Sequence, residues 1–118
     1  MNFCWATLHV NDFEESLHFY HDIFGLPIDS RHGGDGLKIA MLGKEKETKI
    51  ELLWSKDSHA RPGGISIGIE VDSLEKTIKL LKEHNINIIR GPISPNPHVR
   101  FLFVNDPNGY EIQLVETK

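Results

Sequence analysis

The sequence contains almost no cysteine, and this scarcity excludes a disulfide-stapled fold. Its single cysteine, Cys4, has no partner within the 118-residue chain, which is typical of a protein from a reducing compartment. We expect Cys4 to behave as a small apolar residue buried on a strand. The first residues also lack a basic leader followed by a long apolar segment, so we expect a cytoplasmic protein.

Long apolar runs and an excess of basic charge are also missing. No run approaches the roughly 18 apolar residues that a membrane-spanning helix requires, so no membrane partner is expected. The formal net charge is −4, with 13 Lys and Arg against 17 Asp and Glu and no basic stripe, so nucleic acid is not an expected partner. Hydrophobic residues make up 39% of the chain and charged residues 25%, which predicts one globular domain over residues 1–118.

The most informative feature that is present is an internal repeat. Residues 8–20 match residues 69–81, and residues 50–52 match residues 112–114 at nearly the same offset. Two matched blocks at one offset indicate a duplicated unit. Each copy alone would leave one face of a sheet uncovered, so we expect the copies to pack together. The predicted organisation is module one at 1–55, a linker at 56–64 that contains Pro and Gly, and module two at 65–118.

Each module is predicted to contain a strand, a helix and three further strands. Short segments rich in Val, Ile and aromatic residues predict the strands. They are residues 3–10, 27–31, 36–43 and 48–55 in module one, and residues 65–71, 86–91, 98–105 and 110–116 in module two. After the first strand of each module, apolar residues recur every three or four positions and predict a helix with one apolar face. These residues are Leu17, Tyr20 and Phe24 in the first helix, and Leu74, Ile78 and Leu81 in the second.

Start and stop signals bound both predicted helices. Asn11 or Asp12 can cap the first helix and Asp72 the second, because a short polar side chain accepts a hydrogen bond from the first helical turn. Gly25 is expected to end the first helix and Asn85 the second.

Motifs along nearly the whole chain carry a resemblance to a known family. They are Val10-x-Asp12, Ser16-x-x-Phe19-Tyr20 and Gly25-Leu26 in module one, and Val71-Asp72, Phe103-Val104-Asn105-Asp106-Pro107-Asn108-Gly109-Tyr110 and Gln113-Leu114-Val115-Glu116 in module two. In these motifs the sequence resembles the vicinal oxygen chelate superfamily, which includes glyoxalase I, the extradiol dioxygenases and the bleomycin- and fosfomycin-resistance proteins. The resemblance implies an α+β fold in which two βαβββ modules form an eight-stranded, cup-shaped mixed sheet with flanking helices. It also implies a small-molecule ligand in the cup, a divalent metal in many members, and a homodimer.

The resemblance places the metal ligands of the family at Trp5, Glu51, Ser66 and Gln113. Metal-dependent members carry His, Gln or Glu there, because such ions prefer imidazole and carboxylate donors. An indole N–H only donates hydrogen bonds and cannot ligate a metal, and serine and glutamine are weak neutral ligands. Only Glu51 remains as a strong ligand, so we favour no metal. Nickel, cobalt, zinc, manganese or iron stays open as the alternative, with His9 as a substitute ligand.

Strand alternation adds further residues to the candidate site. Thr7 and His9 share a face with Trp5, and Glu70 shares one with Ser66. We favour His9 as a hydrogen-bonded pocket residue. The expected ligand-binding set is Trp5, Thr7, His9, Glu51, Ser66, Glu70 and Gln113.

An inward-facing Glu51 without a metal needs polar partners, because a lone buried carboxylate is costly. We expect the Trp5 indole, the Ser66 hydroxyl and the Gln113 amide to supply them. Two loops, 30–36 and 91–97, are expected at the rim, where they could close over a ligand.

The expected function is therefore binding of a small organic molecule without the usual metal of the family. One alternative is a metal-dependent lyase or isomerase of the glyoxalase I (lactoylglutathione lyase) type, in which the metal polarises substrate oxygens. Another is a metal-free enzyme with Glu51 or His9 as general base. The fold does not choose among these functions. If the protein is an enzyme, Glu51 is the expected catalytic residue.

Overall fold

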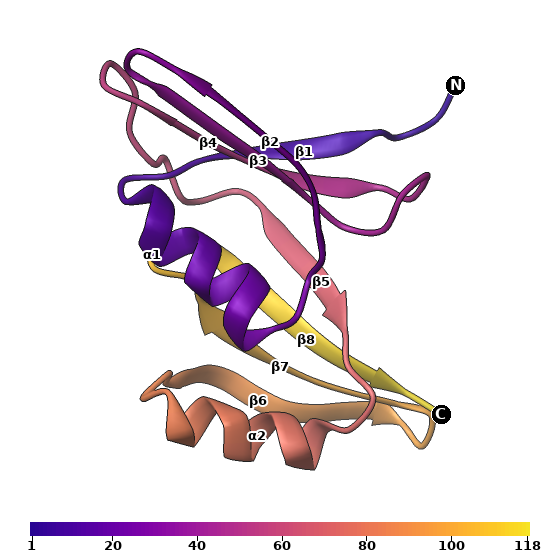
Figure 1. The fold of residues 1–118 in the computed structure, drawn as a ribbon. Helices are drawn as coiled ribbons and strands as arrows, with labels where there is room; N and C mark the ends of the chain where they lie inside the picture. The colour runs from indigo at the N-terminus through magenta and orange to yellow at the C-terminus, as the bar shows by residue number, and fades with distance from the viewer. The chain divides into compact units, whose positions relative to one another are not determined.

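The computed structural model describes all residues from 1 to 118. The chain divides into two compact units, Met1–Arg61 and Pro62–Lys118, which Figure 1 shows in indigo to pink and in pink to yellow. The boundary lies inside the predicted linker at 56–64. That the two modules act as a single domain stays a prediction. No helix has both the length and the apolar character that crossing a membrane would require.

The first unit is one βαβββ module. Its elements are β1 (Trp5–His9), α1 (Phe13–Leu17), η1 (His18–Ile23), β2 (Ile28–Gly34), β3 (Leu37–Leu42) and β4 (Lys49–Ser55). The sheet order is β1-β4-β3-β2. β1 pairs with β4 in parallel, and the other neighbours are antiparallel. The helix after β1 carries the chain across the sheet, as a parallel connection requires.

The second unit repeats this topology. Its elements are β5 (Ser66–Glu70), α2 (Leu74–Glu83), β6 (Ile88–Asn96), β7 (Val99–Asn105) and β8 (Glu111–Thr117). The sheet order is β5-β8-β7-β6, with β5 and β8 parallel. The prediction of an α+β fold from two βαβββ modules with mixed sheets is therefore confirmed.

Each sheet buries one face beneath its helix. In the first unit Leu8, Leu42 and Leu52 are almost fully buried, and α1 contacts the sheet at β4. In the second unit Leu102 and Leu114 are fully buried, and α2 contacts β8. Each such side chain contributes roughly 1.5–3 kcal/mol through its removal from water. The alternating residues form the opposite face, which we call the open face of each unit.

The predicted helix starts are half right. Asp12 caps α1, since its carboxylate accepts a hydrogen bond from the Glu15 N–H at 3.0 Å. Ser73 caps α2 in the same way, with Lys76 as donor at 3.2 Å, so the prediction of Asp72 is wrong. The cap must directly precede the first helical residue, and α2 begins one residue later than a cap at Asp72 would require.

Replacing the cap of α2 tests this assignment. We expect Ser73→Ala to lower the free energy of unfolding by about 1 kcal/mol, because the lost hydroxyl leaves a first-turn N–H without its partner. Asp72→Ala is the matched control, with an expected change below about 0.5 kcal/mol. Urea unfolding of both variants decides, and a larger loss in Asp72→Ala would contradict the assignment.

The first helix departs from the predicted α-helix. Residues His18–Ile23 form a π-helix, in which the Phe24 N–H donates to the carbonyl of Phe19 at 3.2 Å. The three- and four-residue spacing did not indicate this wider turn. Gly25 and Asn85 end the two helices as predicted, with φ angles of 75° and 56°.

The two predicted rim loops are mostly strand. β2 extends to Gly34, and only Asp35 and Gly36 remain as the turn to β3. β6 extends to Asn96 despite its prolines, with repeated shifts of its register against β7. Both segments lie at sheet edges, where one side of the strand needs no partner, so glycine and proline are tolerated. The prediction that Cys4 is buried is also wrong: it precedes β1 and is exposed.

Candidate functional site

The open face of the first unit brings together most of the residues predicted for module one. The parallel register places Thr7 opposite Glu51 and His9 opposite Leu53. Met41 of β3 lies opposite Glu51 on its other side. Thr7 Oγ1 donates a hydrogen bond to Glu51 Oε1 at 2.6 Å, so this carboxylate has a fixed neutral partner.

Sequence reasoning did not assign Thr7 as a partner of Glu51. Trp5 lies opposite Lys49, one register step before the pair of Thr7 and Glu51. Trp5 is 53% exposed, so about half of its surface is open to contact with another molecule.

His9 is hydrogen-bonded within its own unit. Its Nδ1 atom lies 3.4 Å from the Ser58 hydroxyl, which in turn lies 2.9 Å from the hydroxyl of Ser55. Asn11 holds the same segment by accepting from the Ala60 N–H at 2.9 Å. Sequence reasoning missed Ser58, because nothing in the linker indicates that it folds back to the end of β1.

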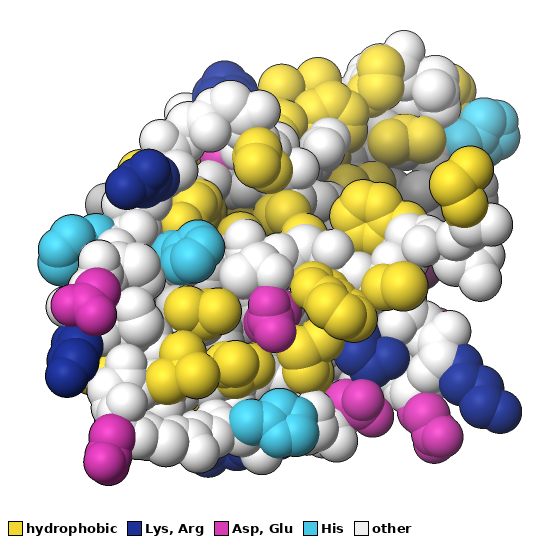
Figure 2. All heavy atoms as spheres, turned by 90° about the horizontal axis from the view of Figure 1, so that it is seen from above, with side chains coloured by type: hydrophobic (Ala, Val, Ile, Leu, Met, Phe, Trp, Pro, Cys, Tyr) yellow, Lys and Arg dark blue, Asp and Glu magenta, His cyan; other side chains and the backbone are white.

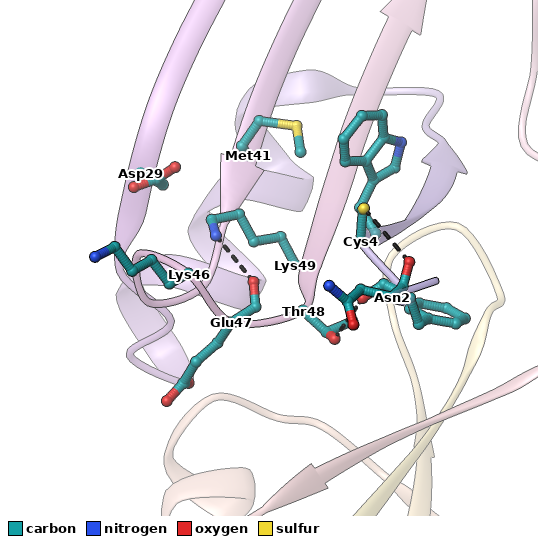
Figure 3. A pocket seen from close by; sticks show the side chains of 10 residues that line it. Asn2, Cys4, Asp29, Met41, Lys46, Glu47, Thr48 and Lys49 are labelled. Atoms are coloured by element: carbon teal, nitrogen blue, oxygen red, sulfur yellow. Dashed lines mark hydrogen bonds between the residues drawn. The ribbon is translucent and has the colours of Figure 1, made fainter.

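An open pocket of about 890 Å³ lies at the start of β1. Its lining consists of residues 2–5, residues 46–49, Asp29 and Met41. Figure 3 shows Lys49 reaching toward the backbone of the β3–β4 turn, where its ammonium group donates to the Glu47 carbonyl at 2.9 Å. The lining of the pocket therefore combines apolar side chains, Trp5 among them, with charged side chains.

Apolar side chains reach the surface around this pocket. Phe3 is 70% exposed, and Figure 2 shows hydrophobic side chains at the surface in several places.

Glu51 and His9 do not line the pocket, so the pocket covers only part of the predicted site. Met41 could have been found from the sequence, because alternation along its strand and pairing with the next strand place it beside Glu51.

The open face of the second unit holds the remaining predicted residues. Ser66 lies opposite Glu111, and Gln113 lies beside Gly68. Glu70 lies at the far end of β5, where its carboxylate accepts from the Thr117 hydroxyl at 3.1 Å. The Ser66 side chain is hydrogen-bonded to Glu111, a partner that sequence reasoning did not assign to it.

A charged cluster on this face was missed by sequence reasoning. Arg90 donates to both carboxylate oxygens of Glu111, at 2.7 and 3.2 Å. Its guanidinium carbon lies 4.0 Å from the ring centroid of Phe103, and Phe103 lies opposite Gln113. We call Ser66, Arg90, Phe103 and Glu111 the Arg90 cluster.

The Arg90 cluster shifts the titration of both ionised groups. The hydrogen bond from Arg90 is the main cause that lowers the pKa of Glu111 from its ordinary value, and Ser66 adds to this effect while burial opposes it. The same hydrogen bond raises the pKa of Arg90, again against burial. Both groups therefore stay charged through the neutral range.

This pairing predicts a specific loss of stability in acid. A carboxylate with a lowered folded-state pKa stabilises the fold above its unfolded pKa, and the contribution disappears as the pH falls through the folded pKa. We expect Glu111→Gln to unfold more easily than the parent at neutral pH, with a difference that shrinks as the pH falls below the ordinary value of 4.5 and vanishes below the lowered folded pKa. Urea unfolding from neutral to acid pH measures this difference. Arg90→Met and the double variant complete a double-mutant cycle for the ion pair. A difference that persists undiminished in strong acid would contradict the pairing.

The residues at the four positions of the family metal site do not fit a divalent ion. Trp5 offers an indole, which has no lone pair for a metal. Ser66 offers a hydroxyl that already bonds to Glu111. Gln113 is a neutral amide, and Glu51 is the only strong ligand. The structure gathers no group of three His, Cys, Asp or Glu side chains suited to hold a metal ion.

Comparison with known proteins identifies the family. A sequence model of the Glyoxalase/Bleomycin resistance protein/Dioxygenase superfamily matches residues 3–114. A probable lactoylglutathione lyase of Synechocystis sp. is 32% identical, with 95% of this chain and 92% of that protein covered. Lactoylglutathione lyase of Haemophilus influenzae is 31% identical, with coverage of 100% and 94%. The chain belongs to this superfamily, so the resemblance drawn from the motifs is confirmed.

Solved structures share the fold at lower identity. The glyoxalase I of Leishmania major superposes with a TM-score of 0.83 at 22% identity, covering 98% of this chain and 86% of that one. TnmS3, an antibiotic binding protein from Streptomyces sp., superposes with a TM-score of 0.79 at 19% identity, covering 100% and 97%. An enzyme and a binding protein thus share the fold, which leaves the activity to be argued from the site.

Proposed function

We propose that this protein binds a small organic molecule on the open face of its first unit, without the divalent metal that is usual in the family. The observation that carries the proposal is Trp5, an exposed indole at the first metal-ligand position and part of the lining of a large pocket. An aromatic ring offers a broad apolar surface for a flat ligand. It offers nothing to a metal ion.

Polar groups beside this indole would orient the ligand. The hydrogen-bonded pair of Thr7 and Glu51 and the His9 ring lie along the same open face. Small-molecule sites combine such a mainly apolar wall with a few fixed polar groups. Ser66, Glu70 and Gln113 are the corresponding polar residues that we propose for module two, and the homodimer and cytoplasmic location remain predictions.

A metal-dependent lyase of the glyoxalase I type is the second candidate. Curated relatives named lactoylglutathione lyase, about 30% identical over nearly the full length of both chains, favour it. So does Glu51, which keeps the carboxylate of the family at its position. In that function the bound metal would polarise the substrate oxygens, and Glu51 would exchange a proton with the substrate.

Tryptophan fluorescence tests ligand binding at Trp5. The chain has two tryptophans, so Trp54→Phe leaves Trp5 as the only reporter and Trp5→Phe leaves Trp54. Trp54 lies on the helix side of β4 beneath Lys38, whose ammonium is 5.4 Å from its ring. We expect benzamide to change Trp5 emission saturably while Trp54 emission stays constant. Equal responses from the two reporters would contradict a site at Trp5.

A further inference from the structure

The Arg90 cluster occupies the part of the second unit where the family places metal ligands. Ser66 and Gln113 stand at the two family ligand positions of this module. Ser66 bonds to Glu111, and Phe103, beneath the guanidinium of Arg90, pairs with Gln113. Arg90 therefore contacts Glu111, which lies opposite Ser66, and Phe103, which lies opposite Gln113. All of these residues belong to the second unit.

Three contacts hold this guanidinium in a fixed orientation. Two parallel hydrogen bonds to Glu111 fix its plane, because a fork-to-fork pair tolerates little rotation. The Phe103 ring covers one side of it at 4.0 Å. Phe103 is itself held edge-to-face by Phe101, with ring centroids 5.7 Å apart. Several side chains thus combine to place one cation on an otherwise open face.

The guanidinium keeps free donors despite its ion pair. Each Nη atom donates one hydrogen bond to Glu111, so the Nε–H and the second hydrogen of each Nη remain for another acceptor. The Arg90 side chain is 50% exposed, and only one of its two sides is covered by Phe103. A second oxygen acceptor can approach without breaking the contacts that orient the group.

We infer that Arg90 is an anion-binding residue of the second unit and contacts the carboxylate of a small organic ligand on the open face of that unit, supplying by guanidinium the positive charge that a metal supplies in other family members. The inference rests on the proposed binding function and narrows the ligand to a small organic carboxylate. Glu111 and Ser66 are positioning residues, since they act on the ligand through Arg90. The net charge of −4 gives a carboxylate no general attraction to the chain, so any preference for it must come from a local cation.

A matched control exists in the first unit. Arg31 is also 50% exposed, lies 3.4 Å from the Glu14 carboxylate, and has its guanidinium 5.4 Å from the Phe13 ring. It differs from Arg90 in lying on β2, away from every family ligand position. Arg31→Met therefore removes a guanidinium that also lies beside a carboxylate and an aromatic ring, and it leaves the proposed site unchanged.

Titration of the full-length protein with benzoate and its neutral analogue benzamide tests the inference. We expect the parent to bind benzoate more tightly than benzamide, and Arg90→Met to weaken benzoate about 10-fold, as loss of a charged hydrogen bond implies. Arg31→Met should stay within about twofold of the parent. Arg90→Lys keeps the charge but not the fork, so it should fall between the parent and Arg90→Met. In Glu111→Gln, benzoate affinity should fall while benzamide affinity holds.

The outcomes separate this inference from the proposed function. If benzamide and benzoate bind equally and both depend on Trp5, the binding function stands and the role of Arg90 is overturned. That role is overturned as well if Arg90→Met and Arg31→Met weaken benzoate alike. If neither probe binds the parent protein at all, the carboxylate site is refuted, and the binding function must then stand on a neutral ligand of another shape.

Discussion

Trp5→Ala is expected to weaken benzamide binding by about 30-fold, the loss of roughly 2 kcal/mol that truncating a central aromatic contact causes. The indole is exposed in the free protein, so its removal leaves no cavity and should cost little stability. The effect should therefore appear in affinity and not in the free energy of unfolding. Calorimetric titration and urea unfolding of the same preparation measure both quantities.

Conservative and distant replacements sharpen this expectation. Trp5→Phe keeps an aromatic surface and should retain affinity within about fivefold of the parent. Trp54→Ala removes the other indole, on the opposite face of the sheet, and should lower stability while ligand affinity holds. A parent-like affinity in Trp5→Ala would show that Trp5 does not contact the ligand, and it would contradict the proposed function.

Gly91→Ala should be among the most destabilising single changes in the chain, lowering the free energy of unfolding by about 3 kcal/mol or more. Gly91 has a φ of 91°, which side-chain-bearing residues rarely adopt. A Cβ atom there would lie 2.9 Å from the Phe101 carbonyl and 3.1 Å from the Leu102 backbone. Backbone strain and a backbone clash therefore act together.

Gly34→Ala is the control for that change. Gly34 lies in β2, the corresponding edge strand of the first unit, without a positive φ and with no atom within 4 Å of an added Cβ. We expect its effect to stay within about 0.5 kcal/mol. Comparable losses from both substitutions in urea unfolding would show that glycine content, and not the geometry at Gly91, matters in these strands.

Most of the fold could be predicted from the sequence because the two modules carry the same pattern twice. Matched blocks at residues 8–20 and 69–81 indicated the order of strand and helix, and most strand ends fell within one or two residues of the observed ends. The errors lie where local signals conflict with sheet pairing. Glycine at 33–34 and proline in 91–97 indicate loops, but both segments pair with a neighbouring strand.

The candidate site was only partly predictable, because the sequence does not show how neighbouring strands are aligned with each other. Alternation on one strand places Thr7 and His9 on the face of Trp5, whereas the pairing of Thr7 with Glu51 depends on the register of β1 against β4. Arg90 could not be placed this way, because β6 pairs with β7 through several register shifts. Glu111 could have been predicted, because it lies two residues before Gln113 and therefore on the same face of β8.

The central claim is that ligand binding here requires no divalent metal. Protein incubated with nickel, cobalt, zinc or manganese, freed of excess metal and analysed for metal content tests it most directly, followed by assay of each sample for hemithioacetal isomerisation. We predict less than about one-tenth of an ion per chain, as a set with one strong ligand implies, and no isomerisation above the uncatalysed rate. About one tightly bound ion per site together with turnover that Glu51→Gln abolishes would contradict the account and establish the lyase.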